Sequence, residues 1–316
     1  MRPLTKIIGI IAAVCALPAI ASADPVKIAL PVMSLESMPI FIAQEKGFFK
    51  KHGVDIDVIT SRGGGEAMKA YIAGEVQIVG TGFPEVGLMR AKGVDVMLFF
   101  AQTSRVPFSL IARTDAGVNS VADLKGKVVA VTSPGSLTDN LTRYFVAQAK
   151  MDPAKDISLV SVGGGGELLG ALKSKRADAA MLFEPFVSIA VGQGFAKVVV
   201  DVAAKLDAFS SAPLSTSKAF LDKSPKEAKA VFDALVEAQQ YIAAHHDETF
   251  EVAQKRFANA DPKVLKSALE HMYKVFSPDG KFSHANVDFT QKISVDLKIM
   301  PKTFAYDEVV APMARK

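Results

Sequence analysis

The chain has 316 residues, 49% of them hydrophobic, with 37 Lys and Arg against 33 Asp and Glu and a single cysteine, Cys15. This near-balance of charge argues against a nucleic-acid partner, which would need a clustered basic surface. The length suffices for two lobes with separate hydrophobic cores. Tryptophan is absent, which weakens the case for a sugar-binding site built on an indole ring.

The first 23 residues have the features of a secretory signal peptide. Arg2 and Lys6 precede an apolar run over residues 7–20, and Ala21-Ser22-Ala23 forms an A-x-A cleavage site. A membrane anchor is the alternative, but it needs about 20 apolar residues, and Pro18 argues against it. We predict cleavage after Ala23, a periplasmic mature protein without cysteine, and no membrane span after cleavage.

The mature chain contains a doubled unit. The segment 63–66 reads Gly-Gly-Gly-Glu and aligns without a gap on the same four residue types at 164–167, with Pro84 falling on Pro185. Two copies separated by about a hundred residues predict paired lobes, because a solenoid would need more and shorter repeats.

Each copy alternates apolar strand patterns with helical patterns that stop at glycine. In the first copy we predict strands at 26–32, 54–60, 76–79 and 94–100, with helices at 39–51, 66–73 and 86–92. In the second copy the predicted strands are 128–131, 157–160, 179–182 and 198–200. Such alternation predicts an α/β fold in which each lobe has a mostly parallel sheet flanked by helices.

Two further apolar segments, 106–113 and 212–217, are predicted to cross between the lobes and act as the hinge. Lobe one is then expected to comprise 24–113 and 212–316, and lobe two 114–211. Helices are predicted from a capping box at Ser224 to about residue 245, then at 261–276 and 286–300, and are expected to pack on lobe one. The histidines there, at 245, 246 and 271, lack metal-binding spacing and are interpreted as solvated or helix-end groups.

The mature chain resembles a known family in several stretches. They are FIAQEKGFFKKHGVDIDV from residue 41, VADLKGKVVAV from residue 121 and ADAAMLFEP from residue 177. In these it is similar to the solute-binding proteins of bacterial ABC importers, within the group for nitrate, sulfonates, taurine and thiamine-pyrimidine precursors. The resemblance implies a two-lobed type II periplasmic-binding-protein fold, a ligand in the cleft, lobe closure on binding and delivery to a permease with its ATPase.

The carboxyl ends of the strands in both lobes are expected to line that cleft, since ligands of open α/β sheets bind there. Several of the loops open helices, whose free N–H groups suit an anion, and glycines allow close approach of the backbone. The residues we expect to contact the ligand are Ser34, Ser37, Met38, Arg62, Gly64, Gly65, Thr81, Gly82, Phe83, Gln102, Arg105, Ser133, Ser136, Thr138, Gly164, Gly165, Phe183 and Glu184.

The charged candidates leave the ligand open. Arg62 and Arg105 are candidate clamps for a carboxylate or sulfonate, although a loop arginine can also be simply solvated. Glu66 and Glu167 are predicted to cap helix N-termini, whereas Glu184 could hold an ammonium or an amine, which would fit taurine or an aminopyrimidine. Phe83 and Phe183 either flank the ligand or belong to the core. We expect a small organic anion, with an aminopyrimidine as the alternative.

Other functions remain possible at this point. The glycines at 163–166 do not continue into a nucleotide-binding motif, so no cofactor is expected, and no metal site is expected either. An exported lyase-like enzyme would need a paired acid and base, and we expect the protein not to be an enzyme. A sensor subunit that presents bound ligand to a membrane receptor would use the same cleft. We expect a monomer that binds a small molecule.

Overall fold

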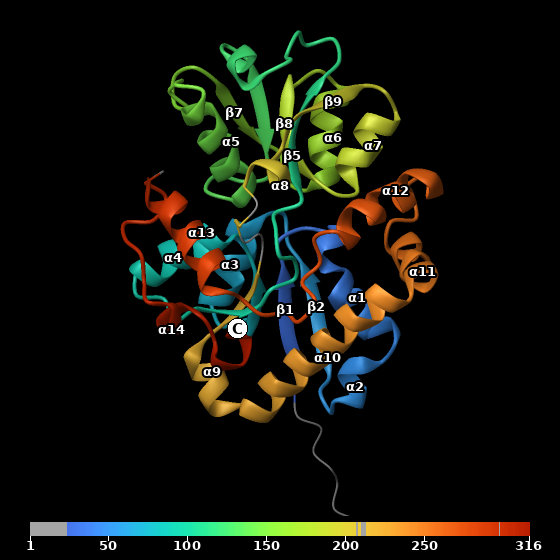
Figure 1. Ribbon diagram of the computed structural model, residues 1–316, viewed down its shortest axis with the longest axis vertical. Helices are drawn as coiled ribbons and strands as arrows, with labels where there is room; N and C mark the ends of the chain where they lie inside the picture. Colours follow the sequence, from blue (N-terminus) through green and yellow to red (C-terminus); the bar gives the residue numbers. More distant parts are fainter. Residues whose placement is uncertain (1–23, 207, 210–212, 297) are drawn as a thin grey trace, which may run out of the picture.

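The computed structural model describes residues 24–206, 208–209, 213–296 and 298–316, which form two lobes stacked along the long axis of the molecule (Figure 1). The predicted signal peptide, residues 1–23, lies outside the described residues. Among the described helices, none is both long enough and apolar enough to span a membrane.

A five-stranded sheet forms the centre of the lower lobe in Figure 1. Its strands are Val26–Leu30 (β1), Ile56–Thr60 (β2), Ile78–Gly80 (β3), Met97–Phe100 (β4) and Leu214–Thr216 (β10), in the order β2-β1-β3-β10-β4. β1 pairs in parallel with β2 and β3, whereas β10 runs antiparallel to β3 and β4. The carboxyl ends of β1 and β3 therefore meet at one edge of the sheet.

The upper lobe has a second sheet of the same kind. Its strands are Phe108–Arg113 (β5), Val128–Val131 (β6), Ser158–Ser161 (β7), Ala179–Phe183 (β8) and Ala196–Asp201 (β9), in the order β7-β6-β8-β5-β9. β6 is parallel to β7 and β8, and β5 is antiparallel to β8 and β9. Both sheets thus repeat one pattern, as the doubled sequence predicts.

Helices flank both sheets (Figure 1). Glycines at positive φ follow the ends of two of them, Gly74 at +76° and Gly93 at +85°, where the sequence predicted helix stops. In chain order the helices of the two sheets are η1 (Leu35–Ser37), α1 (Met38–Glu45), α2 (Phe48–Lys51), α3 (Gly64–Ile72), α4 (Phe83–Ala91), η2 (Val121–Leu124), α5 (Leu137–Gln148), α6 (Gly165–Lys173), α7 (Phe186–Gly192) and α8 (Val202–Lys205).

The C-terminal third is helical. It comprises α9 (Lys218–Lys223), α10 (Pro225–Ala244), α11 (His246–Arg256), α12 (Pro262–Tyr273), α13 (His284–Asp296), α14 (Tyr306–Val309) and η3 (Pro312–Ala314). Helix α11 was not predicted, because its buried residues Thr249, Val252 and Ala253 are few and small and leave a weak apolar pattern. The predicted capping box does not form, since the side chain of Ser224 makes no hydrogen bond at the start of α10.

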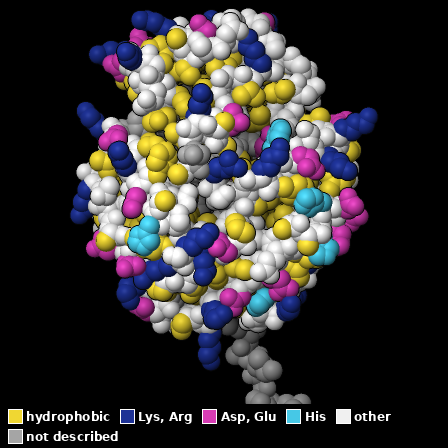
Figure 2. Space-filling view, viewed as in Figure 1, with side chains coloured by type: hydrophobic (Ala, Val, Ile, Leu, Met, Phe, Trp, Pro, Cys, Tyr) yellow, Lys and Arg dark blue, Asp and Glu magenta, His cyan; other side chains and the backbone are white. Residues whose placement is uncertain are grey.

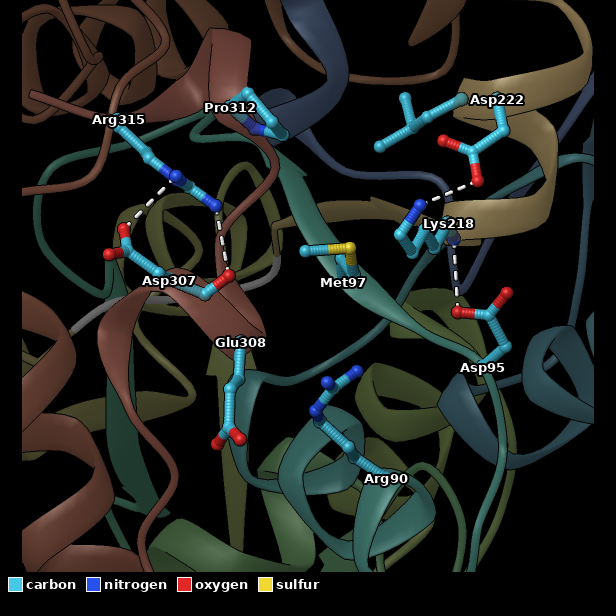
Figure 3. Close-up of a pocket in the computed structure, with 10 residues that line it drawn as sticks. Arg90, Asp95, Met97, Lys218, Asp222, Asp307, Glu308, Pro312 and Arg315 are labelled. Atoms are coloured by element: carbon cyan, nitrogen blue, oxygen red, sulfur yellow. Dashed lines mark hydrogen bonds and ion pairs between the residues drawn. The ribbon is translucent and has the colours of Figure 1, made fainter.

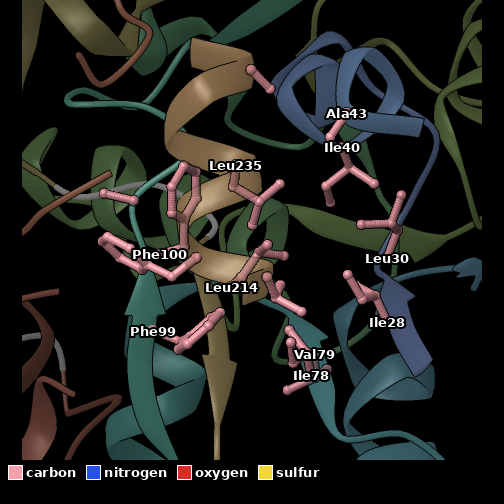
Figure 4. Packing of buried hydrophobic residues seen from close by; sticks show 14 of the residues in the cluster. Ile28, Leu30, Ile40, Ala43, Ile78, Val79, Phe99, Phe100, Leu214 and Leu235 are labelled. Atoms are coloured by element: carbon pink, nitrogen blue, oxygen red, sulfur yellow. The ribbon is translucent and has the colours of Figure 1, made fainter. Parts of the chain in front are cut away.

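Each lobe has its own hydrophobic core. In the lower lobe, Ile28, Leu30 and Phe99 of the sheet pack with Ile40 of α1 and Leu235 of α10 (Figure 4). The core of the upper lobe is formed by residues of β5, β6 and β8 together with α5, α6 and α7. The C-terminal helices α10 and α12 contribute residues to the lower core.

The pairing of β5 moves one expected lobe boundary, and the pairing of β10 places the other predicted crossing segment within the sheet of lobe one, to which it was assigned. Residues 108–113 were expected to cross between lobes as part of lobe one, but β5 hydrogen-bonds to β8 and β9 of the upper sheet. Similarly, β10 is a central strand of the lower sheet. From here on, lobe one denotes 24–100 and 213–316, and lobe two denotes 108–206. The pattern of apolar residues could not reveal which sheet β5 and β10 join, because a strand pairs with partners that are distant in sequence.

Candidate functional site

A small cavity lies between the two lobes at the carboxyl ends of their parallel strands. Its volume is about 30 Å³, room for only a water molecule or two, so the lobes are closed on one another. We call it the cleft cavity. Residues of both lobes line it, namely Pro31, Val32, Glu36, Gly64, Gly82, Glu85, Phe108, Thr132, Ser136, Leu137, Thr138 and Phe183.

The turn from β3 into α4 carries the lobe-one part of the site. Gly82 is the N-cap of α4, and its backbone N–H donates to Oε2 of Glu85 at 2.8 Å. Thr81, directly after β3, is completely buried. Gly64 lies opposite, since a Cβ added there would be 2.6 Å from Oε2 of Glu85 and 2.9 Å from Oγ1 of Thr81. The missing side chain of Gly64 thus makes room beside both groups.

Three hydroxyls form the lobe-two side of the site. Thr132, Ser136 and Thr138 lie around the start of α5, with Oγ to Oγ distances of 2.8 to 3.0 Å. The backbone N–H of Thr132 also donates to Oγ1 of Thr138 at 2.9 Å. All three residues are buried. They therefore satisfy one another and form a pre-organised polar wall.

Three buried polar atoms at the interface of the lobes lack a hydrogen-bond partner among the described residues. They are Oγ1 of Thr81, Oε1 of Glu85 and Oγ of Ser133. A Cβ added at Gly63 of lobe one would lie 2.8 Å from Oγ of Ser133, so this hydroxyl faces the opposite lobe. A buried polar atom without a partner costs about 1–3 kcal/mol. Such atoms from both lobes are what a bound solute would satisfy.

Glu85 is the titratable group with the largest perturbation in the cleft cavity. Burial raises the pKa of its carboxyl to about 8, while the N–H groups of Gly82 and Leu137 oppose that rise. The negative charge of Asp139 in α5 adds to the rise. At neutral pH the ligand-free carboxyl is therefore mostly protonated.

Arg62 lies at the rim and not in the cleft cavity. Its Nη2 is 3.6 Å from Oε1 of Glu167 in lobe two, and its side chain is 73% exposed. Its backbone N–H donates to Oε2 of Glu66 at 2.7 Å, the helix-capping role predicted for that glutamate. Arg62 and Glu167 thus form an exposed ion pair that bridges the lobes, worth at most about 1 kcal/mol.

Arg105 and Glu184 come together in a second and larger cavity on the hinge side, which we call the hinge pocket. Its volume is about 430 Å³, and His271 and Lys274 also line it. Figure 2 shows Lys or Arg and His side chains gathered between the two lobes on this face. Phe108 lines both cavities, so its ring lies between the cleft cavity and the hinge pocket.

The side chain of Glu184 is held within the hinge pocket. It is buried and accepts hydrogen bonds from the Ser188 backbone N–H at 3.1 Å and the Ser188 hydroxyl at 3.0 Å. Nδ1 of His271 in lobe one lies 3.1 Å from Oε1 of Glu184, and this contact raises the pKa of His271. The backbone carbonyl of Glu184 accepts from the Leu35 N–H at 3.0 Å. Glu184 therefore ties the lobes together in two ways.

The other predicted residues divide by position. Gly64, Gly82, Ser136, Thr138 and Phe183 line the cleft cavity. Thr81 and Ser133 do not line it, but their hydroxyls would lie 2.9 Å and 2.8 Å from a Cβ added at Gly64 and at Gly63. The remaining predicted residues do not line the cavity. Five of them are buried elsewhere, namely Ser34, Ser37, Met38, Phe83 and Gln102. A Cβ added at Gly65 would be 3.7 Å from Oγ of Ser133, one at Gly164 would contact Glu167, and one at Gly165 would contact the ring of Phe186.

Seven lining residues were not among the predicted contacts. Three are aliphatic, namely Pro31, Val32 and Leu137, and the others are Glu36, Glu85, Phe108 and Thr132. A signal for Glu85 exists in the doubled unit, because Phe83-Pro84-Glu85 aligns on Glu184-Pro185-Phe186. The carboxylate and the ring have exchanged places between the copies. Glu184 was therefore predicted as a ligand contact, whereas its counterpart Glu85 was not.

A third cavity, of about 310 Å³, opens on lobe one away from the cleft (Figure 3). Its charged groups are largely paired with one another: Arg315 with Asp307 at 3.1 Å, Lys218 with Asp222 at 2.6 Å, and the Lys218 backbone N–H with Asp95 at 2.9 Å. It therefore offers a ligand few unsatisfied groups. Among the described residues there is also no cluster of three His, Cys, Asp or Glu placed to hold a metal ion.

Comparisons with known proteins agree with this architecture. The model of the family described as NMT1/THI5 like matches residues 34–249. YtlA of Bacillus subtilis strain 168, whose name describes a binding protein, is 27% identical over 290 residues, which cover 90% of this chain and 87% of YtlA.

Two solved structures share the fold. The alkanesulfonate-binding protein SsuA from Xanthomonas axonopodis pv. citri, bound to MOPS, has a TM-score of 0.75 at 16% identity, with 94% of this chain and 99% of SsuA covered. The periplasmic nitrate-binding protein NrtA from Synechocystis PCC 6803 has a TM-score of 0.72 at 18% identity, with 90% and 83% covered. The predicted type II periplasmic-binding-protein fold is thereby confirmed.

Proposed function

Because the chain belongs to the NMT1/THI5-like family, we propose that it is the solute-binding component of an ABC importer, which captures a small molecule in the cleft cavity. The observation that carries this proposal is the set of unpartnered buried atoms, which come from both lobes: Thr81 and Glu85 in lobe one and Ser133 in lobe two. A folded chain tolerates such atoms where a ligand supplies their partners.

The mechanism follows from the position of these atoms in both lobes. A solute that bonds to Thr81 and Ser133 at once has full affinity only for the closed arrangement, so binding shifts the lobes toward closure. Closure removes the solute from water and presents one outer shape to a permease and its ATPase. The names of YtlA, SsuA and NrtA describe binding proteins, which supports a transport role over catalysis.

We further propose export to the periplasm with cleavage after Ala23, and function as a monomer. The N-terminal sequence supports export, since Arg2, Lys6 and the apolar run precede the A-x-A site. The fold shared with a periplasmic protein is consistent with this location.

A thermal-shift screen of residues 24–316 tests binding. The protein is first unfolded and refolded to remove any bound ligand, and then heated with nitrate, alkanesulfonates, carboxylates, amines and amidines. A binder at 100 times its Kd stabilises the fold by about 2.7 kcal/mol, which raises the Tm by about 4–5 °C for a chain of this size. The absence of a shift with every class would contradict the proposal.

The variant Ser133→Ala tests the site itself. Loss of one hydrogen bond of about 1 kcal/mol should weaken the solute found in the screen by about five- to tenfold. Ser174→Ala is the matched control, because Ser174 lies at the exposed end of α6 and bonds to Gly170 and Ala171. Equal affinities of the two variants would remove Ser133 from the site.

A further inference from the structure

The charges that line the cleft cavity are all acidic. Glu36 and Glu85 both face it and are both buried, with exposures of 4% and 8%. No Lys, Arg or His is among the described lining residues. Arg62 of lobe one, a predicted anion clamp, is exposed at the rim and paired with Glu167. An anion here would meet two acidic side chains and no basic side chain among the described residues that line the cavity.

The two carboxyl oxygens of Glu85 differ in their hydrogen bonding. Oε2 accepts the Gly82 N–H at 2.8 Å, whereas Oε1 has no hydrogen-bond partner among the described residues. A buried carboxylate with an open oxygen is destabilised unless a cation or donor reaches it. Oγ1 of Thr81, also unpartnered, can accept a hydrogen bond beside it. Together these atoms are complementary to a group rich in N–H donors.

Aromatic rings complete the surroundings of this carboxyl. Phe108 and Phe183 both line the cleft cavity, with ring centroids 5.4 Å apart. The faces of aromatic rings attract cations and disfavour anions. A carboxylate, hydroxyl acceptors and two phenyl rings form a setting that suits a positively charged nitrogen.

We infer that the solute carries a positively charged nitrogen, as an amine or amidine, and that Glu85 binds this group as a carboxylate. This inference rests on the proposed function and names the ligand class for the same site. It departs from the organic anion that the sequence favoured on the basis of helix N-termini and two arginines, because neither Arg62 nor Arg105 lines the cleft cavity.

Binding of such a cation must release a proton. The raised pKa of Glu85 means that the carboxyl of the ligand-free protein is mostly protonated at pH 7. Burial and the negative charge of Asp139 on α5 favour the protonated form, and the Gly82 and Leu137 N–H groups oppose it. The other charged groups nearby are the carboxyl of Glu36 on η1, which lines the same cavity, and Arg143, which pairs with Asp139 at 2.7 Å. When the cation arrives, Glu85 transfers its proton to buffer and forms the ion pair, so about one proton leaves per ligand bound.

Isothermal titration calorimetry at pH 7 in phosphate and in Tris tests the inference with defined probes. Methylammonium, guanidinium and benzamidinium represent the cation class, and acetate and methanesulfonate represent the anion class. We expect at least one of the cations to bind with release of about one proton. Its affinity should rise up to tenfold per pH unit from pH 6 to 8 and level off above pH 8.

The variant Glu85→Gln keeps the shape and removes the charge. We expect it to weaken the cation more than tenfold and to abolish proton release, whereas Glu75→Gln, the same change at an exposed position, should do neither. The pH dependence of the wild-type protein is a second measurement that holds if Glu85→Gln fails to fold.

The outcomes separate this inference from the proposed function. Binding of an anion alone, with affinity that falls as the pH rises above 8, would overturn the inference and leave the transport role intact. Cation binding without proton release, or unchanged in Glu85→Gln, would also overturn it. If neither class binds, both the inference and the proposed function are contradicted.

Discussion

Two glutamates that occupy nearly equivalent places in the doubled chain have different environments. Glu85 faces the cleft cavity with an open oxygen, whereas Glu184 is bonded by Ser188 and by His271 of the other lobe. The turn in lobe one reads Phe83-Pro84-Glu85. The aligned turn in lobe two reads Glu184-Pro185-Phe186, with the ring and the carboxylate exchanged. A shift of two residues along the turn is enough to move a carboxylate from the cleft to the hinge pocket.

The contact between His271 and Glu184 should make stability depend on pH. The hydrogen bond to Glu184 raises the pKa of His271 in the folded state, and nearby Asp201 adds to the rise while Lys274 and partial burial oppose it. The stabilisation is therefore full below the unfolded value near 6.5 and is lost as the pH rises through the higher folded value. Because the side chain is 59% exposed, its size should stay below about 1 kcal/mol.

Urea unfolding of the wild-type protein and His271→Ala, from pH 5.5 to pH 8.5, measures this effect. We expect the difference in unfolding free energy to be largest at pH 5.5 and to vanish toward pH 8.5. His245→Ala is the control at an exposed helix end. A difference that is independent of pH would show that the ion pair does not contribute.

At the scale of elements, the glycine-rich turn before α6 serves packing. A Cβ at Gly165 would lie 2.1 Å from the ring of Phe186 at the start of α7, whereas a Cβ at Gly166 would meet nothing within 4 Å. The close approach of α6 and α7 therefore depends on Gly165. Its neighbour in the same run of glycines is free of this constraint.

The pair of variants Gly165→Ala and Gly166→Ala tests this difference. Overpacking should destabilise the first by about 1–3 kcal/mol, while the second should gain up to about 1 kcal/mol, because alanine restricts the unfolded chain more than glycine does. Urea unfolding at 25 °C gives both values. Equal effects would mean that α7 adjusts without cost.

At the scale of the whole molecule, both lobes contribute to the cleft cavity. Its residues come from the ends of strands in two sheets with separate cores, joined by two crossing connections. A solute in the cleft cavity therefore couples lobes that are otherwise stabilised independently.

Hydrogen exchange measured by mass spectrometry tests this coupling with the solute that the screen identifies. We expect slower exchange in residues 80–85 of lobe one and, together with them, in residues 132–138 of lobe two. Residues 218–222 and 307–315, around the cavity of Figure 3, should be unaffected and act as the internal control. Protection confined to one lobe would argue against closure around the solute.

The amino-acid sequence by itself determined the doubled α/β unit, the helix stops at Gly74 and Gly93, and the region of the cleft. Local patterns of apolar residues and glycine encode these features, because strand and helix periods depend on neighbours in the chain. It also suggested Gly64, Gly82, Ser136, Thr138 and Phe183 as ligand contacts, and these five residues line the cleft cavity.

Only the tertiary structure decided the pairing of β5 and β10 and the direction of the charged side chains. Arg62 was expected in the site and lies at its rim, Arg105 and Glu184 meet in the hinge pocket, and Glu85 faces the cleft cavity. The reason is physical: which side of a turn a side chain faces depends on how two lobes, distant in sequence, close on each other. Charge complementarity in the cleft is therefore a property of the folded chain.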